Sequence, residues 1–130
     1  MSNISQLILG ETGCVSYIIY CNKKKECCIV DPFEGYEEDV LEEIKRLNYP
    51  SVKYVIDTHT HADRVSASSY FANEFGTGVV KSETTKYKGK QITTKDGDIL
   101  KVGYVEIKVM FTPGHTYDHN CYLVNENNLL

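Results

Sequence analysis

The amino-acid sequence predicts an α/β fold, in the form of a sandwich with a mixed β-sheet and helices on one face. Short runs of β-branched and aromatic residues, which are typical of strands, are interleaved with two segments of helical periodicity. Strand pairs joined by short polar turns occur near both ends, which favours a sandwich over a purely parallel, doubly wound sheet. At 130 residues the chain has the length of one domain, so we expect a single domain over residues 1–130.

The N-terminal elements are predicted from local pattern alone. Residues 15–20 and 27–30 are apolar and strand-like, and the polar segment between them predicts a hairpin turn. Pro32 ends the second strand because proline has no backbone donor for a sheet ladder. Residues 37–47 carry an apolar stripe at helical spacing, with acidic residues at the start and basic residues at the end, which predicts a helix.

The rest of the chain is predicted to be mostly β-structure with one further helix. Residues 66–75 predict a short helix that stops at Gly76, and Asp96-Gly97 predicts a hairpin turn. A further strand begins near residue 129. The other expected strands lie at residues 52–56, 78–81, 99–102, 105–111 and 121–124.

Composition and charge exclude several classes of protein. The net charge is −4, without the basic surface that a duplex-binding module needs, so we expect no nucleic-acid partner. No apolar run approaches the roughly 20 residues of a membrane span, and the N-terminus lacks the pattern of a signal peptide, so we expect no membrane partner. The five cysteines include no Cys-x-x-Cys pair. They are expected to be reduced, mostly buried thiols, which predicts a cytoplasmic location.

All four histidines lie in two segments that directly follow predicted strands. On extended backbone the side chains of His59 and His61 point the same way and can reach one ion. His115 follows a Thr-Pro-Gly turn, which proline stiffens and glycine opens to close approach, and it supplies a third imidazole. We expect His119 to support the site or to pack rather than to bind metal. The alternative for the His59–His61 pair is two solvent-exposed loop histidines.

Three imidazoles with one open position are typical of a catalytic zinc site, in which the ion lowers the pKa of a bound water. Two histidines with a carboxylate would instead suit ferrous iron and oxygen chemistry. The sequence therefore predicts one divalent metal, zinc or ferrous iron, held by His59, His61 and His115. The choice between the two metals stays open.

Three motifs follow one another in the chain: THTHAD at 58–63, DGDILKVG at 96–103 and TPGHT at 112–116. Together with the opening hairpin and its Asp-Pro turn, they resemble the metallo-β-lactamase fold superfamily over nearly the whole chain. The closest resemblance is to the branch of the persulfide dioxygenases and the hydroxyacylglutathione hydrolases, which are glyoxalase II-like. Within that branch, the segment HADRVSA at 61–67 favours the dioxygenase side.

The resemblance implies roles for individual residues. In dinuclear hydrolases, the matches of His59, His61 and His115 bind the first metal and the match of Asp63 binds the second. In the persulfide dioxygenases, the matches of His59 and His115 bind a single iron together with a downstream aspartate, and His61 and Asp63 do not bind it directly. Arg64 stands where the hydrolases usually have a further histidine. Because its charge disfavours a second cation, we expect one metal, unless Arg64 turns to solvent.

Two residues are candidate catalytic groups. Asp63 can serve as a ligand or base, although pairing with Arg64 would weaken it in both roles. Tyr117 carries a phenol that, beside a metal, can orient a substrate or donate a proton. The resemblance implies a further carboxylate ligand and a second half of the sandwich beyond residue 130, so residues 1–130 are expected to correspond to the N-terminal half of the domain. Within them, Asp63 or Asp118 would have to supply a carboxylate.

The resulting hypothesis is a metal-dependent enzyme that acts on a small thiol-derived substrate, either a glutathione-type persulfide or a thioester of glutathione. The alternative is an inactive or degenerate metal-binding or interaction module of the same fold. A half-sandwich would leave an apolar face uncovered, so we also expect the chain to self-associate.

Overall fold

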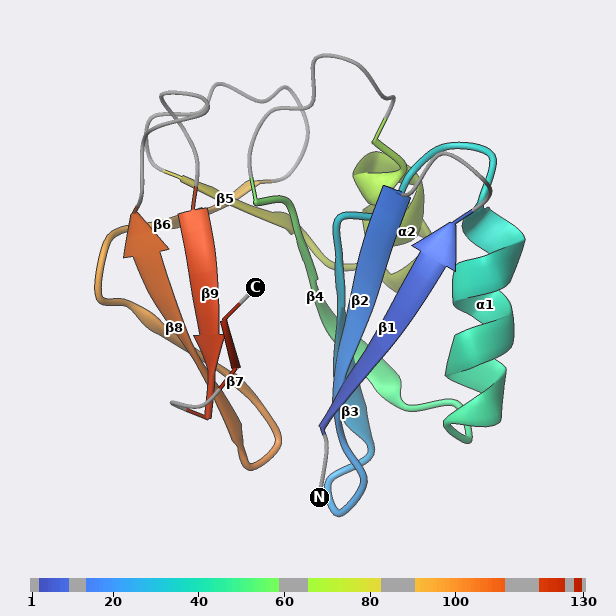
Figure 1. The fold of residues 1–130 in the computed structure, drawn as a ribbon, viewed down its shortest axis with the longest axis horizontal. Coiled ribbons are helices and arrows are strands. Elements are labelled where there is room, and N and C mark those ends of the chain that lie inside the picture. Colours follow the sequence, from blue (N-terminus) through green and yellow to red (C-terminus); the bar gives the residue numbers. More distant parts are fainter. Residues whose placement is uncertain are drawn as a thin grey trace.

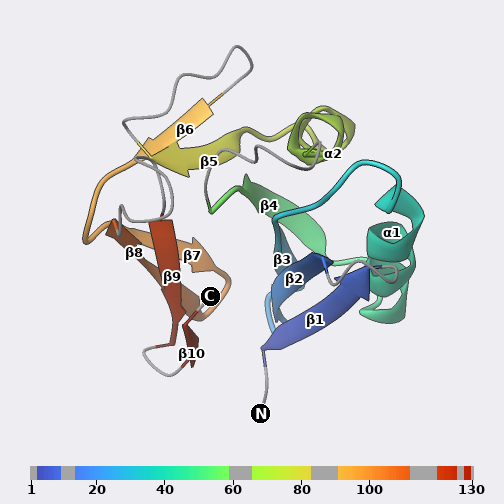
Figure 2. The same cartoon turned by 45° about the horizontal axis from the view of Figure 1, so that its top comes forward.

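The computed structural model describes residues 3–9, 14–58, 66–82, 91–111, 120–125 and 128–129. These residues form a six-stranded sheet, a four-stranded sheet and two helices. The two sheets lie against each other, and the helices lie on the outer side of the larger one (Figure 1). Figure 2 shows the same layers with the upper end of Figure 1 tilted toward the viewer.

The larger sheet has the strand order β1-β2-β3-β4-β5-β6. Neighbouring strands from β1 to β3 are antiparallel, whereas β3, β4, β5 and β6 run parallel. The carboxyl ends of these parallel strands therefore lie at one edge of the sheet, which is where α/β sheets usually carry their functional sites. The strands are β1 (Ile4–Leu9), β2 (Cys14–Cys21), β3 (Glu26–Val30), β4 (Ser51–Ile56), β5 (Val79–Ser82) and β6 (Gln91–Thr94).

The smaller sheet is antiparallel and has the order β10-β9-β8-β7. Its strands are β7 (Ile99–Val102), β8 (Val105–Phe111), β9 (Asn120–Val124) and β10 (Asn128–Leu129). In β8 buried and exposed residues alternate, because successive side chains of a strand point to opposite faces. Ile107 and Val109 face the larger sheet, whereas Glu106 and Lys108 are exposed.

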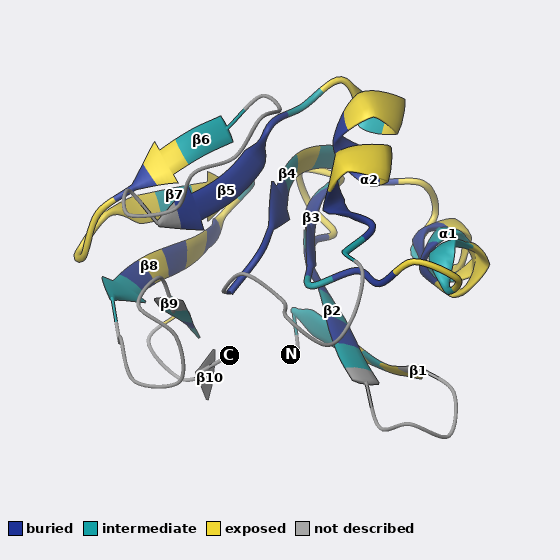
Figure 3. Cartoon of the chain, turned by 90° about the horizontal axis from the view of Figure 1, so that it is seen from above, coloured by how far each residue is buried: buried dark blue, intermediate teal, exposed yellow. Residues whose placement is uncertain are grey.

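Both helices cover the face of the larger sheet that points away from the smaller one (Figure 3). Helix α1 (Glu37–Arg46) buries Val40 and Ile44 against the strands, and its acidic first turn and basic last turn match the helix dipole. Helix α2 (Ser68–Phe75) buries Phe71 and ends at Gly76, whose φ of 66° is the left-handed conformation that glycine adopts freely.

The core consists of two apolar clusters on the two faces of the larger sheet. One lies between the sheets and includes Cys28 and Val30 of β3, and the other lies under the helices and includes Cys27 and Ile29. β3 is therefore buried on both faces, which explains why its sequence is a continuous apolar run rather than an alternating pattern.

Most predicted elements are confirmed, with ends that move by one or two residues. Strand β1 was not expected; as an edge strand it is only half packed, and its Ile8 is 71% exposed, so its apolar pattern is weak. The predicted hairpin turn at Asp96-Gly97 is wrong. This turn connects β6 of the larger sheet to β7 of the smaller one, so the strands on its two sides do not pair.

Two further predictions concern the state of the cysteines and the presence of a membrane-spanning segment. Cys21, Cys27 and Cys28 are free, buried thiols, as predicted. Neither helix in the described part of the chain has the length and apolar character needed to cross a membrane.

Candidate metal centre

The two segments that carry the predicted ligands start from described strand ends. Residues 59–65, with His59, His61 and Asp63, follow the end of β4 and lie outside the described residues. Residues 112–119, with His115 and Tyr117, lie between β8 and β9 and are also outside them, as are Arg64, Asp118 and His119. The upper end of β4, the tip of β8 and the start of β9 lie at the same end of the sandwich (Figure 1).

A direct contact joins these strand ends across the two sheets. Tyr122 of β9 is fully buried, and its hydroxyl donates a hydrogen bond to the backbone carbonyl of Asp57 at 3.3 Å. Asp57 follows β4 and stands just before the first histidine segment, whereas Tyr122 stands just after the second one. The fold therefore brings the anchors of the two segments together, although they are far apart in the sequence.

Asp57 is the centre of a buried polar cluster at this end. Its carboxylate accepts hydrogen bonds from Ser68 Oγ (2.5 Å) and Ser66 Oγ (3.4 Å) on Oδ1, and from Lys81 Nζ (2.9 Å) on Oδ2. Its backbone N–H donates to the carbonyl of Val80 on β5 at 3.1 Å. The side chains of Asp57 and Lys81 are only 3% and 9% exposed, so this is an ion pair inside the protein.

A second carboxylate holds the next residue of the chain. Asp31 follows β3 with a φ of 51°, and its carboxylate accepts hydrogen bonds from the Thr58 backbone N–H (2.9 Å) and hydroxyl (2.8 Å). The carbonyl of Asp31 in turn accepts a hydrogen bond from Ser16 Oγ at 2.6 Å. Asp57 and Thr58, the last described residues before the first histidine segment, are therefore each fixed by side chains from other elements.

The predicted ligands are three imidazoles, and a donor set of this kind suits one divalent cation. Both described carboxylates hold the end of β4 in place, and the part of the chain that the structure describes contains no group of His, Cys, Asp and Glu side chains arranged for a metal. A metal here would be held by the imidazoles of His59, His61 and His115, which suit zinc or ferrous iron. Such an ion would supply Lewis-acid chemistry to a bound substrate.

The sequence did not single out the residues of this polar cluster. Asp57 follows a buried strand, which is a signal for the edge of an α/β sheet. Lys81 is the third residue of the short strand β5, and nothing in the local sequence indicates that its side chain is buried. Ser68 is one of several serines in its segment, and Tyr122 is one of ten tyrosines in the chain, so local pattern does not distinguish either residue.

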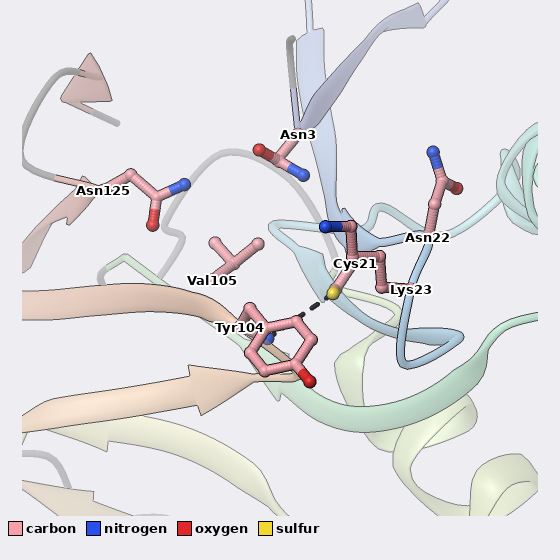
Figure 4. A pocket seen from close by; sticks show the side chains of 7 residues that line it. All are labelled: Asn3, Cys21, Asn22, Lys23, Tyr104, Val105 and Asn125. Atoms are coloured by element: carbon pink, nitrogen blue, oxygen red, sulfur yellow. Dashed lines mark hydrogen bonds between the residues drawn. The ribbon is translucent and has the colours of Figure 1, made fainter.

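The opposite end of the sandwich carries a cavity of about 270 Å³, lined by Cys21, Tyr104 and asparagine side chains among others (Figure 4). The backbone N–H of Tyr104 donates to Cys21 Sγ at 3.4 Å. Burial acts to raise the pKa of the Cys21 thiol, but backbone N–H groups of Tyr104, Lys24 and Lys23 lower it below its ordinary value. This cavity lies away from the end of β4 and is distinct from the candidate metal centre.

Comparisons with known proteins agree with the fold described above. Residues 9–130 match the metallo-beta-lactamase superfamily. The crystal structure of ETHE1 from Myxococcus xanthus superposes with a TM-score of 0.85 at 28% identity, over 93% of this chain and 53% of that chain. A metallo-beta-lactamase from Staphylococcus aureus superposes with a TM-score of 0.82 at 24% identity, over 94% of this chain and 38% of that chain, and it supports the fold alone.

Curated sequence relatives include two kinds of protein. The hydroxyacylglutathione hydrolase of Buchnera aphidicola is 33% identical over 82% of this chain and 41% of the relative. The beta-lactamase hydrolase-like protein of Agrobacterium fabrum is 30% identical over 87% of this chain and 33% of the relative. The chain thus spans between a third and a half of the length of these relatives. With the match over residues 9–130 and a confirmed sandwich fold, the chain belongs to the metallo-β-lactamase superfamily.

Proposed function

We propose that this chain carries the metal-binding part of an enzyme that acts on a glutathione-type thioester or persulfide. The observation that supports it most is the Tyr122–Asp57 hydrogen bond, which holds the strand before the first histidine segment against the strand after the second. Histidines that are far apart in the sequence can share one ion only if their segments start from neighbouring points.

In this proposal each predicted residue has a separate task. His59, His61 and His115 hold one divalent cation, zinc or ferrous iron. Asp63 accepts a proton from the reacting group, and Tyr117 orients the substrate or donates a proton to it. Arg64 keeps a second cation away, because a guanidinium stays positively charged and cannot bind metal.

The relatives favour two related substrates. One relative, at 33% identity, is a hydroxyacylglutathione hydrolase, which supports a hydroxyacyl thioester of glutathione. The structural likeness to ETHE1 and the segment HADRVSA favour the persulfide, with O₂ as the second substrate. Both substrates carry a glutathione group, but they would place different atoms at the metal: a thioester its carbonyl oxygen, and a persulfide its terminal sulfur.

The test measures metal binding and turnover separately. The purified chain is titrated calorimetrically with zinc and with ferrous iron, and then assayed for thioester loss and for O₂ consumption with glutathione persulfide. We expect one ion per chain and turnover of one substrate with one metal. His115→Ala should weaken binding more than His119→Ala; equal effects of the two variants would show that the ligand assignment is wrong.

A second candidate function is a metal-binding or interaction module without turnover. It is favoured by Arg64, because a guanidinium stands where the hydrolases usually have a further histidine ligand. Binding of one ion without loss of either substrate would support this candidate over the enzyme. Failure to bind either metal would contradict the enzyme and the metal-binding module, and would leave only the interaction module.

A further inference from the structure

We propose that Lys81 and Asp57 form a positioning pair, which fixes the carboxyl end of β4 and thereby the direction in which the His59–His61 segment leaves the sheet. The proposal rests on the proposed metal site, because it assigns these two residues a task toward that site. Neither residue is expected to bind the metal itself.

The geometry shows how the pair would act. Lys81 belongs to β5, the parallel neighbour of β4, and its ammonium lies 2.9 Å from Asp57 Oδ2. The other oxygen of Asp57 accepts a hydrogen bond from Ser68 Oγ of α2 at 2.5 Å. The carboxylate is thus held by a strand on one side and by a helix on the other, and its orientation is determined by both.

The backbone of Asp57 is held as firmly as its side chain. Its N–H donates to Val80 O at 3.1 Å, and its carbonyl accepts the Tyr122 hydroxyl at 3.3 Å. β5, α2 and β9 therefore all converge on the residue that stands two positions before His59. A shift of Asp57 would be passed to that histidine directly along the chain.

Stability alone does not account for a charged pair at this position. Lys81 follows Val79 and Val80, which are fully buried, and its own side chain is only 9% exposed. Apolar residues of similar volume in place of a buried ion pair often leave a protein equally or more stable. What an ion pair adds is a directional constraint, since the ammonium and the serine hydroxyl bind the carboxylate in one orientation.

The experiment compares Lys81→Met with a matched control, Thr94→Val. Thr94 is also buried in the same sheet and donates a hydrogen bond to the carbonyl of Lys81 at 3.2 Å, whereas the Asp57 carboxylate is bound by Lys81, Ser66 and Ser68. The first measurement is amide hydrogen exchange by NMR on the metal-free protein. The Asp57 and Thr58 amides should exchange about tenfold faster in Lys81→Met relative to the Val109 amide of β8, and should not change selectively in Thr94→Val.

The second measurement is zinc affinity by calorimetric titration. Residues that orient metal ligands typically change affinity by roughly 10- to 100-fold when mutated, so Lys81→Met should bind zinc at least about tenfold more weakly. Thr94→Val should stay within about twofold. If Lys81→Met does not fold, the variant Asp57→Asn/Lys81→Met, which removes both charges, is measured in the same way with the same expected result.

The outcomes separate the two proposals. A wild-type chain that binds no metal contradicts the proposed function, while the exchange measurement still tests the positioning pair. Exchange at Asp57 and Thr58 that changes only as much as at Val109 shows a merely structural role and overturns the pair. Unchanged zinc affinity in Lys81→Met, with normal binding by the wild type, overturns it as well.

Discussion

A close contact between the two sheets, at the end opposite the candidate metal centre, can be tested by adding one methyl group at Gly103. Gly103 lies in the turn between β7 and β8 and has a φ of 58°. A Cβ atom there would lie 2.7 Å from both Cβ and Sγ of Cys21 and 2.8 Å from Cβ of Lys24. These distances are well below van der Waals contact, and Cys21 is a buried residue that cannot easily move.

The expected effect of Gly103→Ala has two parts. A left-handed backbone is disfavoured for alanine by roughly 1–2 kcal/mol, and forcing extra atoms into a packed region destabilises by typically about 1–3 kcal/mol. Gly76→Ala is the matched control, because Gly76 has a similar φ of 66° and nothing within 4 Å of the added Cβ. The difference between the two variants therefore isolates the clash, and we expect it to be about 2 kcal/mol.

Urea denaturation followed by circular dichroism gives the free energy of unfolding of both variants and of the wild type. The denaturant slope should stay the same in all three, since the fold is unchanged. If Gly103→Ala and Gly76→Ala lower the free energy of unfolding equally, the β7–β8 turn does not lie against Cys21 and the reasoning is refuted.

Three further predictions concern pH, metal content and assembly. The ordinary pKa of a cysteine thiol is 9.0; burial raises the pKa of Cys27 to about 12 and raises that of Cys28 further. Near pH 10 both thiols therefore stay protonated in the folded state, while they ionise in the unfolded state. The free energy of unfolding therefore keeps its full value below pH 9 and falls as the pH rises further. At pH 10 the two thiols together should lower it by about 3 kcal/mol. In urea titrations Cys27→Ala/Cys28→Ala should lose less stability between pH 8 and pH 10 than the wild type, and equal losses would contradict this. Arg64→His should raise the zinc content of zinc-loaded protein, because the change removes a positive charge and adds an imidazole that can bind metal. Elemental analysis measures this content, and no change would mean that Arg64 does not face the site. We also expect self-association, since Ile8 on edge strand β1 and Ile99 on β7 are 71% and 55% exposed; light scattering that shows a monomer at high concentration would contradict it.

The sequence alone determined the elements that have a strong local signal. The apolar stripe of α1 with its charged ends, the continuous run of β3 and the alternation of β8 all reflect side-chain periodicity, which depends only on neighbouring residues. Strand β1 was not predicted because it lies at the edge of its sheet and is only partly buried, so its sequence lacks a strong apolar pattern. The turn at Asp96-Gly97 was predicted as a turn, but its sequence does not say which sheet each flanking strand joins.

The candidate ligands were also visible in the sequence, since imidazoles at this spacing are unusual and the motifs around them resemble a known superfamily. The contacts that fix the strand end before the first histidine segment could not be predicted from the sequence. Asp57 meets Lys81 across 24 residues and Tyr122 across 65, and such pairings exist only once β4, β5 and β9 have been brought together. Local sequence can specify which side chains are able to bind a metal, whereas the position of their strand ends is decided by long-range packing and hydrogen bonds, because these depend on the arrangement of the whole sandwich.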